Sequence, residues 1–187
     1  MNQNVVTETF HNEGGIKVGA IVRRIEPTSL STLLCFTSPD GLHHVESRIE
    51  FDDENPFNWT HYVQHDDEAF VERDRQPGDP ANVVPGHAEC LLVSRLLDSG
   101  EQELEFTLLD ERTERMRPAV LVHKGDEVGL YSEDQLLNRH RVLGDEVIAS
   151  DWEGNGSRLV HDVNELLEGL DDAICVRVRN FLRGSEI

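Results

Sequence analysis

Three histidines have the residue type and the spacing of metal ligands. His61 and His65 are four residues apart, so on a helix both would lie on one face. Neutral imidazole is a common ligand of zinc and other divalent metals, and His87 follows the Pro- and Gly-rich loop at 76–86. The pattern predicts a divalent metal site at His61, His65 and His87, with exposed loop histidines as the alternative.

The segments THYVQHDDE and GDPANVVPGH, at 60–68 and 78–87, resemble the double motif of the cupin family. In that family a His and a Glu from one hairpin join a His that follows a G-D…P-G turn. The resemblance covers residues 60–87 and implies ligands at His65, Glu68 and His87 in a metal-dependent barrel enzyme. Val63 stands where the first His of the family's motif belongs.

The stretch PGHAEC at 85–90 contains the His-x-Glu of a zinc nucleobase deaminase, in His87 and Glu89. Such a site also needs two thiolates from a P-C-x-x-C motif, because a catalytic zinc takes three protein ligands and a water. The three cysteines, at 35, 90 and 175, form no C-x-x-C. The sequence therefore excludes a deaminase of the familiar kind. It also contains no G-x-S-x-G, P-loop or G-x-G-x-x-G motif.

Acidic residues dominate the charge. The chain has 37 Asp and Glu against 17 Lys and Arg, a net charge of −20. Such a chain repels phosphate backbones and anionic membrane surfaces, so neither nucleic acid nor a membrane is expected as a direct partner. Three interpretations of the acidity stay open: a solvated surface, adaptation to high salt, or a binding face for a basic partner.

The region 40–79 concentrates this charge, with twelve acidic residues against three arginines, a net charge of −9. Aromatic residues interleave with the acids, as in a surface that binds a basic protein or imitates DNA; the alternative is an acidic loop region whose aromatic residues anchor it to the core. The leading hypothesis is a non-catalytic interaction module for a basic protein partner, without a cofactor. The alternatives are the cupin-like metal enzyme and a DNA-mimic inhibitor of a nucleic-acid-binding protein. The predicted partner-binding residues are Asp52, Asp53, Trp59, Asp66, Asp67 and Glu68.

The cysteine pattern favours a reducing compartment, because each thiol lies in an apolar run and three cannot form a complete disulfide framework. The N-terminal residues have neither the basic nor the apolar region of a signal peptide, so a cytoplasmic protein is expected. A small basic edge at Arg177, Arg179 and Arg183 would pair either with Asp171 and Asp172 or with the acidic surface of a second copy, and the second alternative makes a homo-oligomer an additional hypothesis.

The predicted fold class is α+β: a mainly antiparallel twisted sheet or partial barrel, with a C-terminal amphipathic helix packed on it. Residues 1–15 are predicted to be a flexible arm and residues 16–187 a single domain. Segments within 16–54 alternate like a meander, with a turn at 39–41. Residues 55–62 fit a short helix, and the alternative is a hairpin with strands at 60–64 and 69–73.

The second half of the chain contains segments with the alternation of strands and segments with the spacing of helices. Residues 88–98 and 102–110 predict a hairpin across Ser99-Gly100, although 88–98 also fits a helical stripe. Two strands are expected at 117–123 and 127–131. Capping signals and apolar spacing predict helices at 132–143 and 157–170, and alternation predicts a last strand at 173–181.

Overall fold

The computed structural model describes residues 4–184, and within them thirteen strands form one sheet. Its order is β6-β5-β4-β3-β2-β1-β13-β12-β11-β10-β9-β8-β7, and all neighbours are antiparallel except β7 and β8. The first strands are β1 (Asn4–His11), β2 (Lys17–Glu26), β3 (Ser29–Ser38), β4 (Gly41–Phe51), β5 (Trp59–Asp66), β6 (Phe70–Asp74) and β7 (Val83–Pro85). The others are β8 (Glu103–Leu109), β9 (Met116–Lys124), β10 (Glu127–Ser132), β11 (Gln135–Leu143), β12 (Glu146–Trp152) and β13 (Asn155–Leu159).

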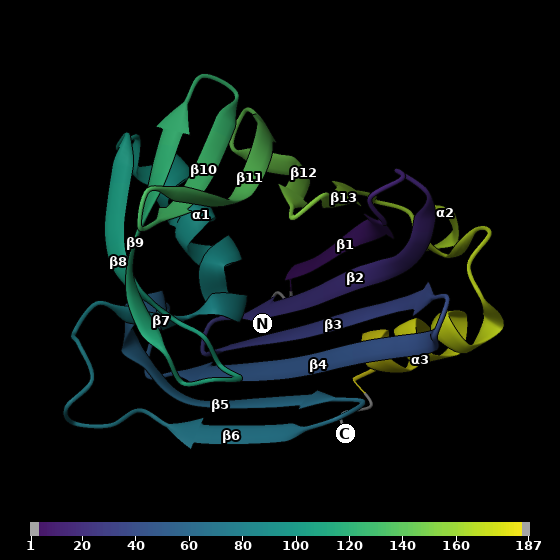
Figure 1. The fold of residues 1–187 in the computed structure, drawn as a ribbon, viewed down its shortest axis with the longest axis horizontal. Coiled ribbons are helices and arrows are strands. Elements are labelled where there is room, and N and C mark those ends of the chain that lie inside the picture. Colours follow the sequence, from purple (N-terminus) through teal and green to yellow (C-terminus); the bar gives the residue numbers. More distant parts are fainter. Residues whose placement is uncertain (1–3, 185–187) are drawn as a thin grey trace.

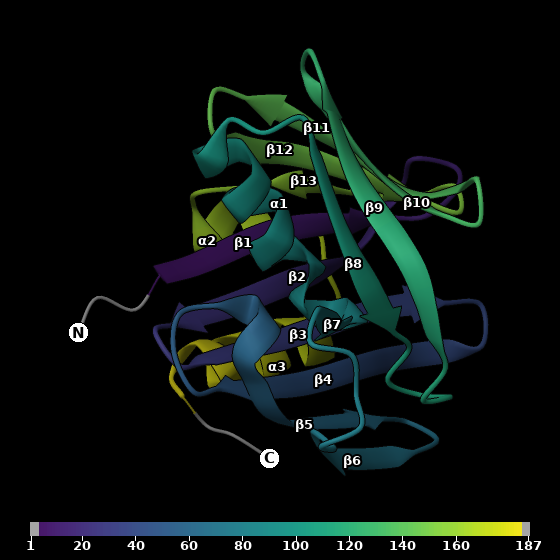
Figure 2. The same ribbon diagram turned by 90° about the vertical axis from the view of Figure 1, so that its left-hand side faces the viewer.

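The sheet curls around the helix α1 (Glu89–Ser99), as Figure 1 shows. Strands β1–β6 form one wall and β8–β11 the facing wall, with α1 between them. The helices α2 (Val163–Leu167) and α3 (Asp172–Leu182) lie on the outer side of the first wall, and Figure 2 shows α3 behind β3 and β4. Two single turns of 3-10 helix, η1 (Pro56–Asn58) and η2 (Gly86–Ala88), precede β5 and α1.

The predicted mainly antiparallel sheet is confirmed, and so are several of its strands. The meander over 16–54 is β2, β3 and β4, and the pair at 117–123 and 127–131 is β9 and β10. Residues 59–74 take the hairpin alternative as β5 and β6. The predicted loop at 76–86 contains the short strand β7, which pairs with β8 in parallel register from Val83 to Pro85.

The prediction of a loose arm at residues 1–15 is wrong for the part the structure describes. Residues 4–11 are β1, which lies in the middle of the sheet between β2 and β13. Polar β1 residues such as Thr7 and Glu8 are buried there, because their side chains find hydrogen-bonding partners inside the protein. Residues 1–3 lie outside the described part of the chain.

Residues 88–98, predicted as the first strand of a hairpin, are helical. In α1 the buried residues Leu92, Val93, Leu96 and Leu97 repeat at helical spacing and form one apolar face. Gly100 ends the helix with a φ of 69°, and its N–H bonds the carbonyl of Leu97. Over eleven residues the same letters fit both periodicities, and the helical stripe was the correct alternative.

Three elements near the C-terminus were also predicted wrongly. The helix expected at 132–143 is β11, where Ser132 bonds the carbonyl of Pro118 in place of capping a helix. The helix at 157–170 is divided between β13 and the short α2. The strand at 173–181 is α3, because the Asp171 carboxylate caps the N–H of Ala173 and starts a helix.

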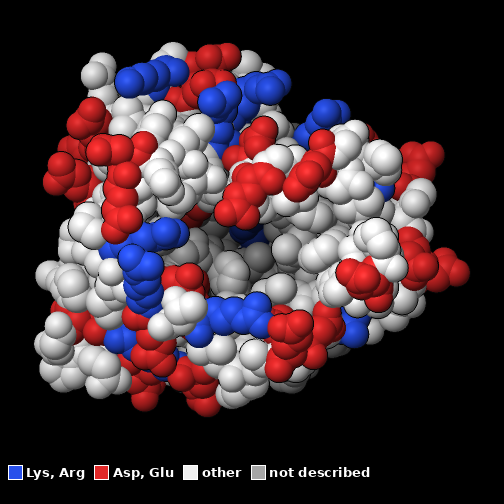
Figure 3. All heavy atoms as spheres, in the orientation of Figure 1, with Lys and Arg blue, Asp and Glu red and all other residues white. Residues whose placement is uncertain are grey.

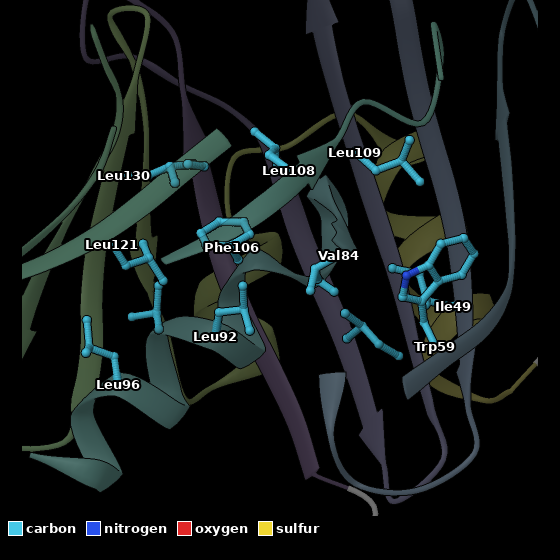
Figure 4. Packing of buried hydrophobic residues seen from close by; sticks show 14 of the residues in the cluster. Ile49, Trp59, Val84, Leu92, Leu96, Phe106, Leu108, Leu109, Leu121 and Leu130 are labelled. Carbon is cyan, nitrogen blue, oxygen red and sulfur yellow. The ribbon is translucent and has the colours of Figure 1, made fainter. Parts of the chain in front are cut away.

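Two apolar clusters hold these layers together. The larger one lies inside the curl, where α1 packs against both walls, and Figure 4 shows Leu92 and Leu96 of α1 beside Phe106 and Leu121. The smaller one lies between the outer face of the first wall and α2 and α3. In α3, Ile174, Val178 and Phe181 are its buried residues, at helical spacing. No described helix is long and apolar enough to cross a membrane.

The strands at the two ends of the sheet, β6 and β7, do not pair with each other. Side-chain hydrogen bonds connect these two ends instead. The indole Nε1 of Trp59 donates to the carbonyl of Val83 (2.9 Å), and the Tyr62 hydroxyl donates to the carbonyl of Glu111 (2.9 Å). Both aromatic residues are 1% exposed. Burial and the nearby Glu111 carboxylate raise the pKa of Tyr62 to about 12, so its hydroxyl remains a donor at neutral pH.

Tyr62→Phe is expected to lower the free energy of unfolding by about 1–2 kcal/mol, because the buried Glu111 carbonyl then loses its donor. Urea denaturation followed by circular dichroism measures the change. Tyr131→Phe, at the other tyrosine of the chain, is the control and should change stability by less than about 0.5 kcal/mol. Equal effects of the two substitutions would show that Tyr62 does not join the ends of the sheet.

Candidate functional site

The first turn of α1 carries an acidic side chain into the interior of the curl. Glu89 Oε1 lies 2.9 Å from His140 Nε2, and Asn138 Nδ2 donates to the other oxygen of Glu89. His140 Nδ1 in turn lies 2.9 Å from Ser150 Oγ on the neighbouring strand β12. A chain of carboxylate, imidazole and hydroxyl therefore connects α1, β11 and β12.

The partners of His140 determine its tautomer. An ionised carboxylate only accepts hydrogen bonds, so the proton of neutral His140 resides on Nε2 and faces Glu89. Nδ1 is then an acceptor for the Ser150 hydroxyl. This is the polarity of a serine nucleophile and its general base, with the two ring nitrogens exchanged relative to the usual triad. The arrangement can accept a proton from Ser150.

A second polar chain continues on the adjacent strands. Ser157 Oγ on β13 donates to Glu8 Oε1 on β1 (2.8 Å), and the other oxygen of Glu8 pairs with Arg23 on β2. Glu8 is 4% exposed and Ser157 is 2% exposed. Ser150 and Ser157 are direct partners in the β12–β13 register, so the two chains meet.

Register extends this arrangement into a polar row that crosses the inner face of the sheet. Arg23 pairs with Thr32, Thr32 with Ser47, and Ser47 with Gln64 on successive strands. Thr32, Ser47 and Gln64 lie on the same strand faces as Leu30, Ile49 and Tyr62, which belong to the cluster around α1. The polar row has one residue on each of eight neighbouring strands: Gln64, Ser47, Thr32, Arg23, Glu8, Ser157, Ser150 and His140.

The part of the polar row next to α1 borders a cavity of about 440 Å³, here called the inner cavity. Glu8, Arg23, His140 and Ser150 line it. Its apolar wall comes from both sheet and helix: Val6, Ile25, Val93, Val147 and Leu159. Asp145 and Glu146, both exposed, line it from the β11–β12 turn. Apolar walls, a few polar groups and this volume are typical of ligand-binding pockets.

Cys90 also lines the inner cavity. Burial raises the pKa of its thiol, so at neutral pH the sulfur is a protonated, weakly nucleophilic group. Cys35 is buried under α3, and burial raises its pKa to about 11. Both of these cysteines therefore behave as small core residues and not as catalytic thiolates.

The structure does not bring His61, His65 and His87 together. The prediction placed His61 and His65 on one helical turn, but both belong to strand β5, where four residues span about 13 Å. His61 Nδ1 bonds Asp74 (2.8 Å), and the ring of His65 packs edge-on to His44 with 5.5 Å between centroids. Within residues 4–184 no group of three or more His, Cys, Asp or Glu side chains is arranged to hold a metal ion.

His87 and Glu89 of the PGHAEC stretch face different partners. The His87 N–H donates to Glu111 Oε1 (2.6 Å), and its Nδ1 lies 3.5 Å from the same oxygen. Glu89 points to His140. Glu68 of the cupin-like set is paired with Arg112 (2.7 Å). The His-x-Glu spacing therefore does not form one site here.

The predicted partner-binding residues are also separated. Trp59 is 1% exposed and cannot contact a partner. Asp52 and Asp53 precede β5, whereas Asp66 ends the strand and Asp67 and Glu68 follow it. Asp67 already bonds His44 (2.6 Å), and two backbone N–H groups lower the pKa of Asp66. The five acids are on the surface but do not form one binding face.

Sequence reasoning missed the interior polar residues, Glu8, Arg23, His140, Ser150 and Ser157. A signal for some of them existed, because Arg23 interrupts an apolar strand and His140 alternates with Val142. Their association depends on register between strands that are distant in the chain, such as β1 and β13. A single sequence does not contain that information.

No family model and no curated protein matches the chain. Among solved structures, it is similar to the crystal structure of a β-barrel-like protein of the domain of unknown function DUF1849 from Brucella abortus. The TM-score is 0.50 at 10% sequence identity, and the match covers 84% of this chain and 94% of that chain. The likeness shows a shared barrel-like, mainly β fold.

Glu8→Gln is expected to lower the free energy of unfolding by about 3 kcal/mol, because it leaves Arg23 without its charge partner in the interior. The matched control is Glu50→Gln, in the exposed pair with Arg48, which should cost less than about 1 kcal/mol. Denaturant unfolding of both variants measures the difference. Similar costs at the two positions would contradict a structural role for the polar row.

Proposed function

We propose that the chain is a non-catalytic interaction module that binds a protein partner with a basic surface. The observation that carries the proposal is the position of its charge. Within residues 4–184, Glu8 and Glu111 are buried and the side chains of Asp79 and Glu89 are only 6% and 12% exposed, but most of the other acidic residues are exposed. Figure 3 shows acidic side chains over much of the visible face, including one edge of a central hollow.

Electrostatics favours such a partner in two ways. A protein with a net charge of −20 accelerates its encounter with a cationic surface, and complementary charge excludes anionic competitors. The basic residues of the chain do not neutralise its negative charge, because it has only 17 Lys and Arg and 37 Asp and Glu. The proposal rests on the whole acidic surface and not on the 52–68 segment predicted from the sequence.

The whole chain should bind a fluorescein-labelled octapeptide of alternating lysine and leucine, measured by fluorescence anisotropy. Because exposed charges are screened by salt, affinity should fall at least about tenfold between about 0.05 and 0.5 M NaCl. The control is an octapeptide of alternating glutamate and leucine, which should not bind. Absence of binding to the lysine peptide, or binding that does not depend on salt, would contradict the proposal.

A second candidate function, acyl transfer at Ser150, is favoured by the hydrogen-bonded order of Glu89, His140 and Ser150. In that reaction the Ser150 oxygen attacks an ester carbonyl and its proton moves to His140 Nδ1. The proton then leaves with the alcohol, and water releases the acyl group. The inner cavity, which Ser150 lines, would hold the ester.

A fluorophosphonate probe tests this candidate directly, because Ser150 would form the Oγ–P bond as fluoride leaves. Labelling is expected to disappear in Ser150→Ala and to persist in Ser94→Ala, which changes another serine of the same cavity. Intact-protein mass spectrometry detects the adduct. An unlabelled wild-type chain, or labelling that survives Ser150→Ala, would exclude Ser150 as a nucleophile.

A further inference from the structure

Two neighbouring cavities lie against α1. The inner cavity shares Asn4, Ile25 and Ser94 with a second, larger cavity of about 670 Å³, here called the outer cavity. The outer cavity extends along α1 to the β2–β3 turn and η1, where Leu91, Phe51 and Pro56 provide apolar surface. Because the two cavities share lining residues, they form one elongated binding surface, the α1 groove.

The charge of the α1 groove is strongly negative. Its lining contains six acidic residues against two arginines, a difference of four: Glu8, Asp145 and Glu146 in the inner cavity, and Glu26, Glu54 and Asp98 in the outer one. Both arginines are already engaged. Arg23 pairs with Glu8, and Arg95 donates to Asn55 Oδ1 (2.7 Å) while it packs on the ring of Phe57.

Several of these acids are available to a ligand. Asp98, Asp145 and Glu146 are exposed, and their carboxylates have no ion pair within residues 4–184. The linings of both cavities also contain apolar side chains, such as Leu91 in the outer one and Val93 and Val147 in the inner one. A peptide with alternating cationic and apolar side chains would match both the acidic and the apolar residues of the lining. Lysine and arginine suit such a surface, because each carries its charge at the end of a long apolar chain.

We propose that the α1 groove binds an extended basic segment of the protein partner, with one lysine or arginine side chain inserted into the inner cavity. This inference rests on the proposed function and assigns its location. The inserted cation would lie beside the exposed carboxylates of the β11–β12 turn, at Asp145 and Glu146. Its stem would pack on Val93 and Val147, and apolar side chains of the segment would cover Leu91 and Phe51.

The charge test uses two turns at opposite ends of β11. Asp145→Asn with Glu146→Gln removes two charges from the groove, whereas Asp134→Asn with Glu133→Gln removes two from the β10–β11 turn. The strand of nine residues places these turns about 30 Å apart. Affinity for the lysine–leucine octapeptide should fall about tenfold in the first variant and less than about twofold in the second.

A steric test is independent of charge. Ser94 is exposed on α1 and lines both cavities, so Ser94→Trp fills the junction of the groove without disturbing the core. It should weaken peptide binding about tenfold, while Gln135→Trp, at an exposed position on β11, should not. Circular dichroism and thermal unfolding of each variant establish that it is folded.

The outcomes separate the two proposals. If the wild-type chain binds the octapeptide and both groove variants retain its affinity, the α1 groove is the wrong location and the interaction function stands. If the control turn variant loses as much affinity as the groove variant, binding reflects net charge alone, which also overturns the groove. If the wild-type chain does not bind the octapeptide at any salt concentration, the proposed function itself fails.

Discussion

The burial of α1 inside the curled sheet is the interaction on which the rest of the structure depends. Leu92, Val93 and Leu96 are at most 1% exposed and contact residues of both walls through one apolar cluster. Loss of one such leucine side chain typically costs about 2–5 kcal/mol, a large part of the stability of a domain of this size. The two walls are continuous through β13 and β12, but β6 and β7 do not pair, so the helix and the hydrogen bonds of Trp59 and Tyr62 connect the open ends of the sheet.

The two faces of α1 thus have different roles. The apolar face fills the interior, and its first turn delivers Glu89 to His140 and the polar row. The opposite face, with Ser94 and Asp98, remains exposed and forms one side of the α1 groove. The helix that stabilises the sheet therefore also shapes the surface to which we assign binding.

Turn residues and alternation of apolar residues were sufficient to predict strands that are joined by a tight turn. The turn at Pro39-Asp40-Gly41 and the alternation on either side of it predicted β3 and β4 correctly. Short segments with two compatible periodicities were harder. In α3 the alternation of Ile174, Val176 and Val178 suggested a strand, yet Val176 is 54% exposed and the helical set is the buried one. The Asp171 cap was the competing signal that decided the outcome.

The site could be predicted far less than the fold. Glu89 was singled out for its spacing from His87, but its partner is His140, 51 residues away in the chain. The histidines chosen for a metal site lie on a strand, where a spacing of four residues does not create a shared ligand position. Trp59 was assigned to a binding face because it is aromatic and flanked by acids, although its indole is buried and donates to the carbonyl of Val83. Each error arose because long-range register and burial determine which side chains meet.

The central claim is that a basic segment lies along α1, and a spin-labelled guest tests it most directly. A lysine–leucine octapeptide with a nitroxide at one end should broaden the amide resonances of Ser94, Asp98, Asp145 and Glu146 in the labelled chain. It should spare Glu133 and Asp134 at the far end of β11, because paramagnetic broadening is steep in distance and these turns lie about 30 Å apart. Broadening spread evenly over the acidic surface, or centred away from α1, would contradict the account.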